Sequence, residues 1–179
     1  MRKEIVLSGY GGQGLVLAGI ILAEAAVIYE GKNATHNQSY GPEARGGASR
    51  SEIIISDEEI NYPEIERPDI LLAMTQDALD KYGESVKEGG LIIIDTLYIK
   101  EVKPRSDVEI YELPITEISI RETGKPLSAN IVALGVLVSL TGIVKRESLE
   151  AAMLNRVPPA TRDLNLKALR AAFDIFKKG

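Results

Sequence analysis

The stretch that decides the fold reads EIVLSGYGGQGLVLAGIILAEAAVIYEG over residues 4–31. Its beginning, Glu4-Ile5-Val6-Leu7, is an apolar run that ends in glycines and predicts a buried first strand. Residues 15–29 follow as a long Ala, Leu, Ile and Val segment without proline, which predicts a helix closed by Gly31. A strand, a glycine loop and a helix in this order indicate the start of an α/β fold.

The rest of the chain continues the alternation of strands and helices. Apolar runs predict strands at residues 49–56, 69–74, 91–94 and 108–113, and residues 33–38, although polar, are interpreted as the second strand. Helices are predicted from a cap at Thr75 through about residue 86, at 130–141, at 146–156, and at the C-terminus with Leu166, Leu169, Phe173 and Phe176 on one face. We therefore expect a three-layer α/β/α fold, with a Rossmann-like, mostly parallel sheet and helices on both faces.

Length, net charge and hydropathy limit the classes of protein to which the chain can belong. The 179 residues fit a single domain, 1–179, and a net charge of -5 gives no general attraction to nucleic acid or to an anionic membrane. The most apolar stretch, residues 131–140, is shorter than the roughly 20 residues that cross a bilayer. The N-terminus shows no signal-peptide pattern, so we expect a cytoplasmic protein.

The chain contains no cysteine and one histidine, His36. It therefore supplies no thiolate to an iron–sulfur cluster, and a zinc site built on imidazoles is not expected. Redox chemistry would then need a bound organic cofactor or another subunit. A lone histidine beside a glycine loop is more often a hydrogen-bonded structural residue, and Met74 and Met153 are most simply core residues.

The first glycine loop satisfies the spacing G-x-G-x-x-G with Gly9, Gly11 and Gly14. Such a loop lets the backbone approach a phosphate at a helix N-terminus, and Gln13 adds an amide that could reach a ligand. The alternative is a tight strand-to-helix turn that needs glycine for conformational reasons alone. Dinucleotide binding also demands a carboxylate about 20 residues on. Here residues 34–38 contain none, and Glu30 is badly placed, which counts against an NAD-dependent enzyme.

A second motif, SYGPEARGG, spans residues 39–47. Its glycines allow close backbone approach, and Arg45 can grip a carboxylate or phosphate through two parallel hydrogen bonds. Alternatively, Glu43 forms ion pairs with Arg45 or Arg50 that order a long loop. Asp95-Thr96 lies at the carboxyl end of a predicted strand, where open sheets bind ligands, and is equally well explained as a cap.

The two motifs together resemble the gamma subunit, or gamma domain, of 2-oxoacid:ferredoxin oxidoreductases, with 2-oxoglutarate-type members closest in the second motif. The resemblance covers essentially the whole chain. It extends to Gly89-Gly90-Leu91-Ile92-Ile93-Ile94-Asp95 and to Asn130-Ile131-Val132-Ala133-Leu134-Gly135.

The resemblance implies membership of a multisubunit enzyme that oxidatively decarboxylates a 2-oxoacid such as 2-oxoglutarate or pyruvate to an acyl-CoA. Alpha and beta subunits would hold thiamine diphosphate, and iron–sulfur clusters on partners, including a ferredoxin-like delta subunit, would pass electrons to ferredoxin. The gamma chain would bind or cover coenzyme A, hold no tightly bound cofactor and be inactive alone.

Site residues follow from the resemblance as hypotheses, with no catalytic residue and no metal ligand assigned. The first loop would be shaped by Gly9, Gly11, Gly12 and Gly14, with Gln13 as its polar arm. The surface toward the catalytic subunits and coenzyme A would comprise Tyr40, Gly41, Glu43, Arg45, Gly46 and Gly47, with Arg45 and Arg50 as charge partners of the cofactor.

Two other classes of protein compete with this interpretation. One is an autonomous NAD-dependent dehydrogenase on a Rossmann-like fold, which the absent ribose carboxylate argues against. The other is a non-catalytic nucleotide-binding module, which would bind an adenine nucleotide alone and co-purify with no thiamine enzyme.

Overall fold

A computed structural model describes residues 1–40 and 48–177 of the chain, with the side chain of Tyr40 left aside. Within these residues a sheet of six strands has the order β2-β3-β1-β4-β5-β6. The strands are β1 (Arg2–Tyr10), β2 (Asn33–Tyr40), β3 (Ala48–Ser56), β4 (Ile70–Ala73), β5 (Leu91–Asp95) and β6 (Glu109–Leu113). The helices are α1 (Leu15–Glu30), α2 (Gln76–Tyr82), α3 (Ile115–Thr123), α4 (Ala129–Thr141), α5 (Arg146–Arg156) and α6 (Arg162–Ile175).

The sheet is mixed but mostly parallel, as the sequence predicts. β1 pairs parallel with β4, β4 with β5, and β5 with β6. β3 runs against both of its neighbours, β1 and β2. Since β2 and β1 both run opposite to β3, they point the same way, and β3 is the one reversed strand among the described residues.

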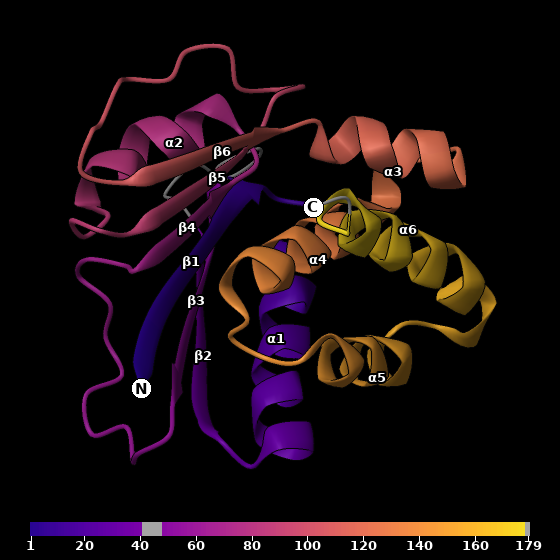
Figure 1. Ribbon diagram of the computed structural model, residues 1–179, viewed down its shortest axis with the longest axis horizontal. Coiled ribbons are helices and arrows are strands. Elements are labelled where there is room, and N and C mark those ends of the chain that lie inside the picture. Colours follow the sequence, from indigo (N-terminus) through magenta and orange to yellow (C-terminus); the bar gives the residue numbers. More distant parts are fainter. Residues whose placement is uncertain (41–47, 178–179) are drawn as a thin grey trace.

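Two apolar cores lie on opposite faces of the sheet, because alternate residues of a strand point to opposite sides. One core joins Ile5, Leu7 and Ile53 to side chains of α1, α3, α4, α5 and α6. The other joins Val6 and Ile54 to α2 and to the segments that connect the strands. Helices thus lie on both faces, but the cover is unequal: five helices lie on one side and α2 on the other (Figure 1).

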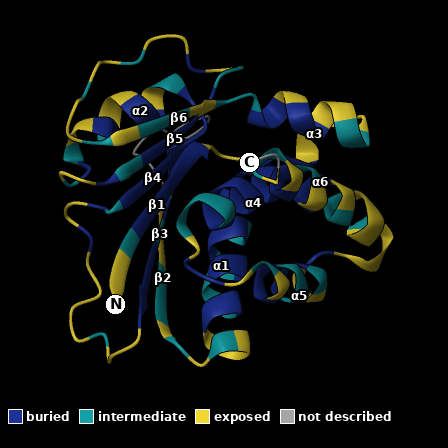
Figure 2. Ribbon diagram, in the orientation of Figure 1, coloured by how far each residue is buried: buried dark blue, intermediate teal, exposed yellow. Residues whose placement is uncertain are grey.

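Helix α4 is the centre of the thicker layer. Ten of its residues, Ala129 to Val138, are buried, so a helix that is apolar all round is covered on nearly every side (Figure 2). A Cβ at Gly135 would lie 2.6 Å from the Cβ of Ala172, which shows how closely α4 and α6 approach. The predicted apolar face of α6 is confirmed: Leu169 and Phe173 are buried, and Leu166 and Phe176 pack at its border.

Most predicted elements occur, with two differences. Helix α2 ends at Tyr82 and passes into a short 3-10 turn, Gly83–Ser85, rather than running to about residue 86, although Thr75 caps it as predicted. Helix α3 has no counterpart in the sequence prediction. Its turns mix Ile115 and Ile118 with polar residues, so it lacks the long apolar run that marks α1 and α4.

His36 is a structural residue, as predicted. Its Nε2 lies 2.8 Å from the hydroxyl of Ser51 on β3, and its ring packs beside Gly19 of α1. Met74 and Met153 are both buried in the core. These three side chains therefore serve packing.

The burial of His36 predicts a measurable pH dependence of stability. Burial lowers the pKa of His36 from its ordinary value of 6.5, so below that value the unfolded chain binds a proton that the folded chain does not. The contribution of the neutral His36 ring to the free energy of unfolding is therefore complete above the unfolded pKa. It is lost as the pH falls from that value through the folded pKa. Between about pH 7.5 and 5.5 we expect urea unfolding midpoints to fall further for the native chain than for His36→Gln. Equal falls in both proteins would contradict this role of the ring.

Candidate functional site

The two glycine motifs leave the sheet at the same edge. Tyr10, the last residue of β1, pairs with Ala48 at the start of β3, and Tyr40, the last residue of β2, pairs with Ser49. The first loop therefore begins beside the ends of the second motif, although about 30 residues of helix and strand separate them in the sequence. This edge is also the carboxyl edge of β4 and β5, where open α/β sheets bind ligands.

The first loop is closed by its own side chain. Oε1 of Gln13 accepts a hydrogen bond from the backbone N–H of Tyr10 at 2.7 Å, and the N–H of Gln13 donates to the carbonyl of Tyr10. The predicted polar arm is thus folded back into the loop through its oxygen. A Cβ at Gly9 would lie 2.1 Å from this Oε1, so glycine is needed there to admit Gln13.

The loop enters α1 through glycines in the left-handed region. Gly12 has φ 91° and Gly14, the N-cap of α1, has φ 75°. Gly11 differs from both, since it has no positive φ and a Cβ there would meet nothing within 4 Å. Gly11 and Gly12 are exposed, so this tip of the loop presents backbone to its surroundings.

Asn130 is a site residue that the sequence analysis did not single out beyond the resemblance. Its Nδ2 donates to the carbonyl oxygen of Gly14 at 3.1 Å, and its Oδ1 accepts the N–H of Ile131. The side chain is buried at the start of α4. The signal available in the sequence was one amide residue at the head of an otherwise apolar helix.

An apolar hollow of about 300 Å³ lies beside the loop. Its walls include Gly12, Gly14, Leu17, Leu127, Ile131 and Leu164. Leu127 is 73% exposed, and Tyr10 at the end of β1 is 48% exposed. Large apolar side chains that remain exposed beside a loop with open backbone are typical of a surface that contacts a partner.

Arg50, the one predicted charge partner that the structure describes, is already engaged within the fold. Arg50 pairs with Glu52, donates to the carbonyl of Ile65, and lies 4.7 Å from the ring centre of Tyr82. Its guanidinium is therefore held inside the fold rather than presented to a ligand. Among the predicted residues of the second motif, Gly41, Glu43, Arg45, Gly46 and Gly47 lie outside the described residues.

Asp95 acts as a cap. It is fully buried, and its carboxylate accepts hydrogen bonds from the N–H of Leu97 and from both the N–H and the hydroxyl of Thr116. These bonds tie the end of β5 to the first turn of α3. Of the two predicted roles for this position, the structure shows the structural one.

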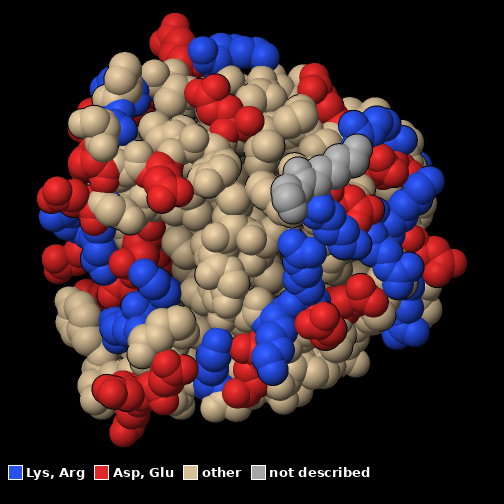
Figure 3. All heavy atoms as spheres, in the orientation of Figure 1, with Lys and Arg blue, Asp and Glu red and all other residues tan. Residues whose placement is uncertain are grey.

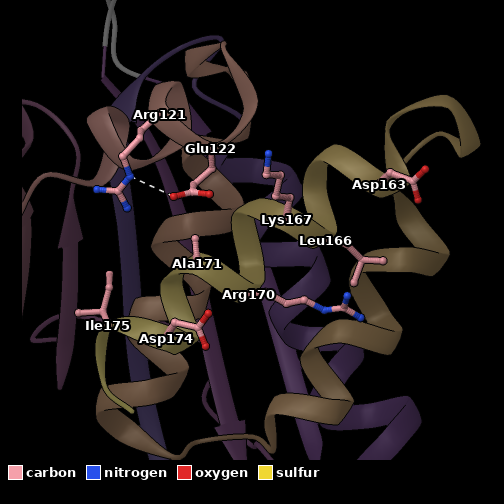
Figure 4. Close-up of a pocket in the computed structure, with 9 residues that line it drawn as sticks. All are labelled: Arg121, Glu122, Asp163, Leu166, Lys167, Arg170, Ala171, Asp174 and Ile175. Carbon is pink, nitrogen blue, oxygen red and sulfur yellow. Dashed lines mark hydrogen bonds and ion pairs between the residues drawn. The ribbon is translucent and has the colours of Figure 1, made fainter. Parts of the chain in front are cut away.

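A wider hollow of about 650 Å³ between α3 and α6 lacks the features of a binding site. Figure 3 shows acidic and basic groups intermixed on the right of the molecule, where Figure 1 places α5 and α6. Arg121 pairs with Glu122, and the side chain of Arg170 points away from that pair (Figure 4). Arg170 pairs instead with Glu150 of α5. Because the cations point in different directions and are partly paired, they do not converge on an anion.

Residues 1–40 and 48–177 contain neither a candidate metal cluster nor a membrane-spanning helix. No three His, Cys, Asp or Glu side chains gather there in a way that could hold a metal ion. None of the helices in the same residues combines the length and the apolar character required to cross a membrane.

Comparison with known proteins identifies the family. Residues 4–175 match the family described as pyruvate ferredoxin/flavodoxin oxidoreductase. The chain belongs to this family. It is 50% identical to the 2-oxoglutarate synthase subunit KorC of Methanocaldococcus jannaschii, over 99% of this chain and 96% of that protein. Its place in the family is that of a gamma subunit, which confirms the resemblance drawn from the two glycine motifs.

Solved structures agree with this assignment. The gamma subunit of a keto/oxoacid ferredoxin oxidoreductase from Geobacter sulfurreducens superposes with a TM-score of 0.86 at 48% identity, over 96% of each chain. The 2-oxoglutarate:ferredoxin oxidoreductase of Magnetococcus marinus gives a TM-score of 0.81 at 21% identity, over 99% of this chain and 32% of that one. At that identity the likeness shows a shared fold, here as one part of a longer chain.

The geometry of the loop predicts that replacing Gly14 destabilises the protein more than replacing Gly11. Gly14→Ala places a Cβ 2.5 Å from Nδ2 of Asn130 at a φ of 75°, so we expect it to lower the free energy of unfolding by about 1–3 kcal/mol. Gly11→Ala is the matched control and should change it by less than about 0.5 kcal/mol. Denaturant unfolding of the isolated chain measures both values. Equal effects at the two positions would contradict this account of the loop.

Proposed function

We propose that this chain is the gamma subunit of a thiamine diphosphate-dependent 2-oxoglutarate:ferredoxin oxidoreductase, and that it covers the site where coenzyme A accepts the acyl group. The choice of 2-oxoglutarate is supported by the relatives: the KorC subunit matches at 50% identity, whereas a subunit common to pyruvate and ketoisovalerate oxidoreductases matches at 34%. The whole chain, residues 1–179, would act as one domain in the cytoplasm.

The observation that carries this proposal is the meeting of the two glycine motifs at one edge of the sheet. Separate loops with separate tasks need not emerge side by side, whereas a single contact surface requires it. Residues at this edge combine exposed backbone at Gly11 and Gly12 with exposed apolar side chains at Tyr10 and Leu127. This combination suits a surface that closes over a cofactor while contacting catalytic subunits.

The reaction assigns different tasks to different chains. Thiamine diphosphate, when bound by the alpha and beta subunits, supplies the carbanion chemistry that releases carbon dioxide. The electron pair must then leave through iron–sulfur clusters, and a chain without cysteine cannot ligate them. A ferredoxin-like delta subunit would receive those electrons. This chain would exclude water from the acyl transfer and position the thiol of coenzyme A, which accepts the acyl group.

Backbone groups are the means by which the first loop would act. The loop ends at the N-terminus of α1, whose first turn contains no acidic residue, so its partial positive charge is not cancelled there. A phosphate of coenzyme A would be favoured near such an end. Arg45, in the second motif, is the proposed charge partner, because Arg50 is engaged within the fold.

Reconstitution tests the proposed function as a whole. The tagged chain should co-purify with a thiamine-binding subunit pair and a ferredoxin-like chain. The assembled complex should oxidise 2-oxoglutarate in the presence of coenzyme A and ferredoxin, and the isolated chain should not. Turnover by the isolated chain, or assembly with an enzyme that uses another 2-oxoacid, would overturn the proposal.

Gly11→Val tests whether the loop tip contacts the catalytic subunits. In the isolated chain a Cβ at this exposed position meets nothing within 4 Å, so we expect folding to be unchanged. In the complex the valine side chain should clash with the catalytic subunit that the loop tip contacts. We therefore expect kcat/KM for 2-oxoglutarate to fall by about tenfold or more, the equivalent of about 1.4 kcal/mol. Glu59→Val, an exposed position beyond the opposite end of β3, is the control and should have no effect. Full activity of the Gly11 variant would show that the tip touches no partner.

Arg45→Ala tests the charge partner of coenzyme A. Loss of one charge-assisted hydrogen bond should raise the KM for coenzyme A by about tenfold, with little change in kcat at saturation. Lys3→Ala, which removes an exposed cation near the start of β1, should leave that KM unchanged. An unaltered KM in the Arg45 variant would remove this residue from the proposed site.

A further inference from the structure

Helix α1 is apolar on every side, yet the described residues cover one side of it only in part. Its only charged residues are Glu24 and Glu30. The residues that face the sheet and α4 are buried, but Val16, Ile20 and Ala23 are half-buried, and Val27 is 44% exposed. Helices that are apolar all round are normally covered all round, as α4 is in this chain.

The partly exposed residues form a regular strip. Val16, Ile20, Ala23 and Val27 follow one another at spacings of four, three and four, which places them on one face of the helix. This spacing is that of the seam in paired helices, where such residues pack into a facing helix. We call these four residues the α1 strip.

Strand β2 next to the strip is equally unprotected. It ends the sheet, so no other described strand pairs with its outer side. Its eight residues include no charged residue and no proline, the devices that usually keep an exposed edge from pairing with another chain. Asn37, Gln38 and Ser39 are exposed.

The strip and the strand edge form one continuous surface. Gly19 packs beside His36 in the middle of β2, since a Cβ there would lie 2.8 Å from the imidazole. On the opposite flank, Glu24 pairs with Arg156 of α5. The α1 strip lies on the solvent side between these two contacts, and Figure 1 shows α1 running alongside β2.

A two-fold axis beside β2 would satisfy both features at once. Helix α1 packs over β2 and β3, and strands lie about 4.8 Å apart, so α1 lies about 5 Å from an axis placed half a strand spacing outside β2. The axis then sets α1 and its symmetry mate about 10 Å apart, which is the distance of directly packed helices. The same two-fold rotation would therefore pair the two β2 strands and pack the two α1 helices.

Charge also permits this arrangement. β2 brings no like charges together across the axis, because it has none. The two carboxylates of α1 are already paired, Glu24 with Arg156 and Glu30 with Lys32. A second copy therefore meets an uncharged strand and an apolar strip.

From this geometry we propose that the chain forms a two-fold homodimer. β2 pairs antiparallel with β2 of a second copy, and the α1 strip packs against its symmetry mate. The proposal does not rest on the proposed enzymatic function. It uses the opposite flank of α1 from the hollow beside the glycine loop, so the site edge stays open to other subunits.

The absence of cysteine makes a direct test available. A single cysteine at Ile20→Cys, near the middle of the strip, can form a disulfide only with a second copy when the purified chain is oxidised. We expect a covalent dimer on a non-reducing gel. Ile28→Cys is the matched control: it lies on the same helix, is more exposed at 61%, and lies off the strip, so it should cross-link far less. Equal cross-linking of both variants, or none at Ile20→Cys, would overturn the proposal.

Charge reversal supplies an independent readout. Analytical ultracentrifugation of the native chain should show a dimer at concentrations of tens of micromolar, of the order of 10⁻⁵ M. Ile20→Glu and Ile20→Lys should each weaken association at least tenfold, with circular dichroism unchanged, and an equimolar mixture of the two should restore it. A native chain that stays monomeric, or a mixture that does not recover, contradicts the proposal. The Ile20→Cys variant in the reconstituted complex adds one more outcome, since a disulfide to a different subunit would show that a partner chain covers the strip.

Discussion

The carbonyl oxygen of Gly14 is the point at which the loop, α1 and α4 are fixed relative to one another. It accepts the N–H of Ala18, which starts α1, and the side-chain amide of Asn130, which belongs to α4. Because α4 is buried along almost its whole length, Asn130 cannot shift without disturbing the core. The shape of the first glycine loop is therefore set from within the fold. A backbone fixed in this way is preorganised to meet a ligand or a partner without reordering.

Much of the fold can be predicted from hydrophobic runs, and the failures have physical causes. Strands β4 and β5 and helix α4 stand out because almost all of their residues are buried, and α1 stands out because its apolar run is long. The reversal of β3 does not, since nothing in an apolar run distinguishes a parallel strand from an antiparallel one. Helix α3 is half polar because its outer side is exposed, and its capping by Asp95 is visible only once β5 and α3 are placed together.

In the site, too, features that depend on residue type could be predicted from the sequence, whereas features that depend on neighbouring side chains could not. Glycine spacing predicts the loop because backbone conformation depends on the residue itself, and Gly12 and Gly14 indeed take the left-handed region. The roles of Gln13 and Arg50 depend on neighbours that sequence does not supply. Gln13 closes the loop on the N–H of Tyr10, and Arg50 finds an acceptor, a carboxylate and an aromatic ring within the fold. Side chains that look suited to a ligand can thus serve to hold the site in shape.

The partly exposed apolar side of α1 follows from the two roles of this helix. Its buried side forms the core with β1 and β3, and its N-terminus ends the glycine loop. A helix that serves both needs apolar residues over more than half of its surface, which leaves little room for charges. The remaining apolar side cannot be covered by α5, which already packs on the flank of Glu24. Since β2 ends the described sheet beside that side, no other described element covers it, and the proposed second copy would cover the helix and the strand edge together.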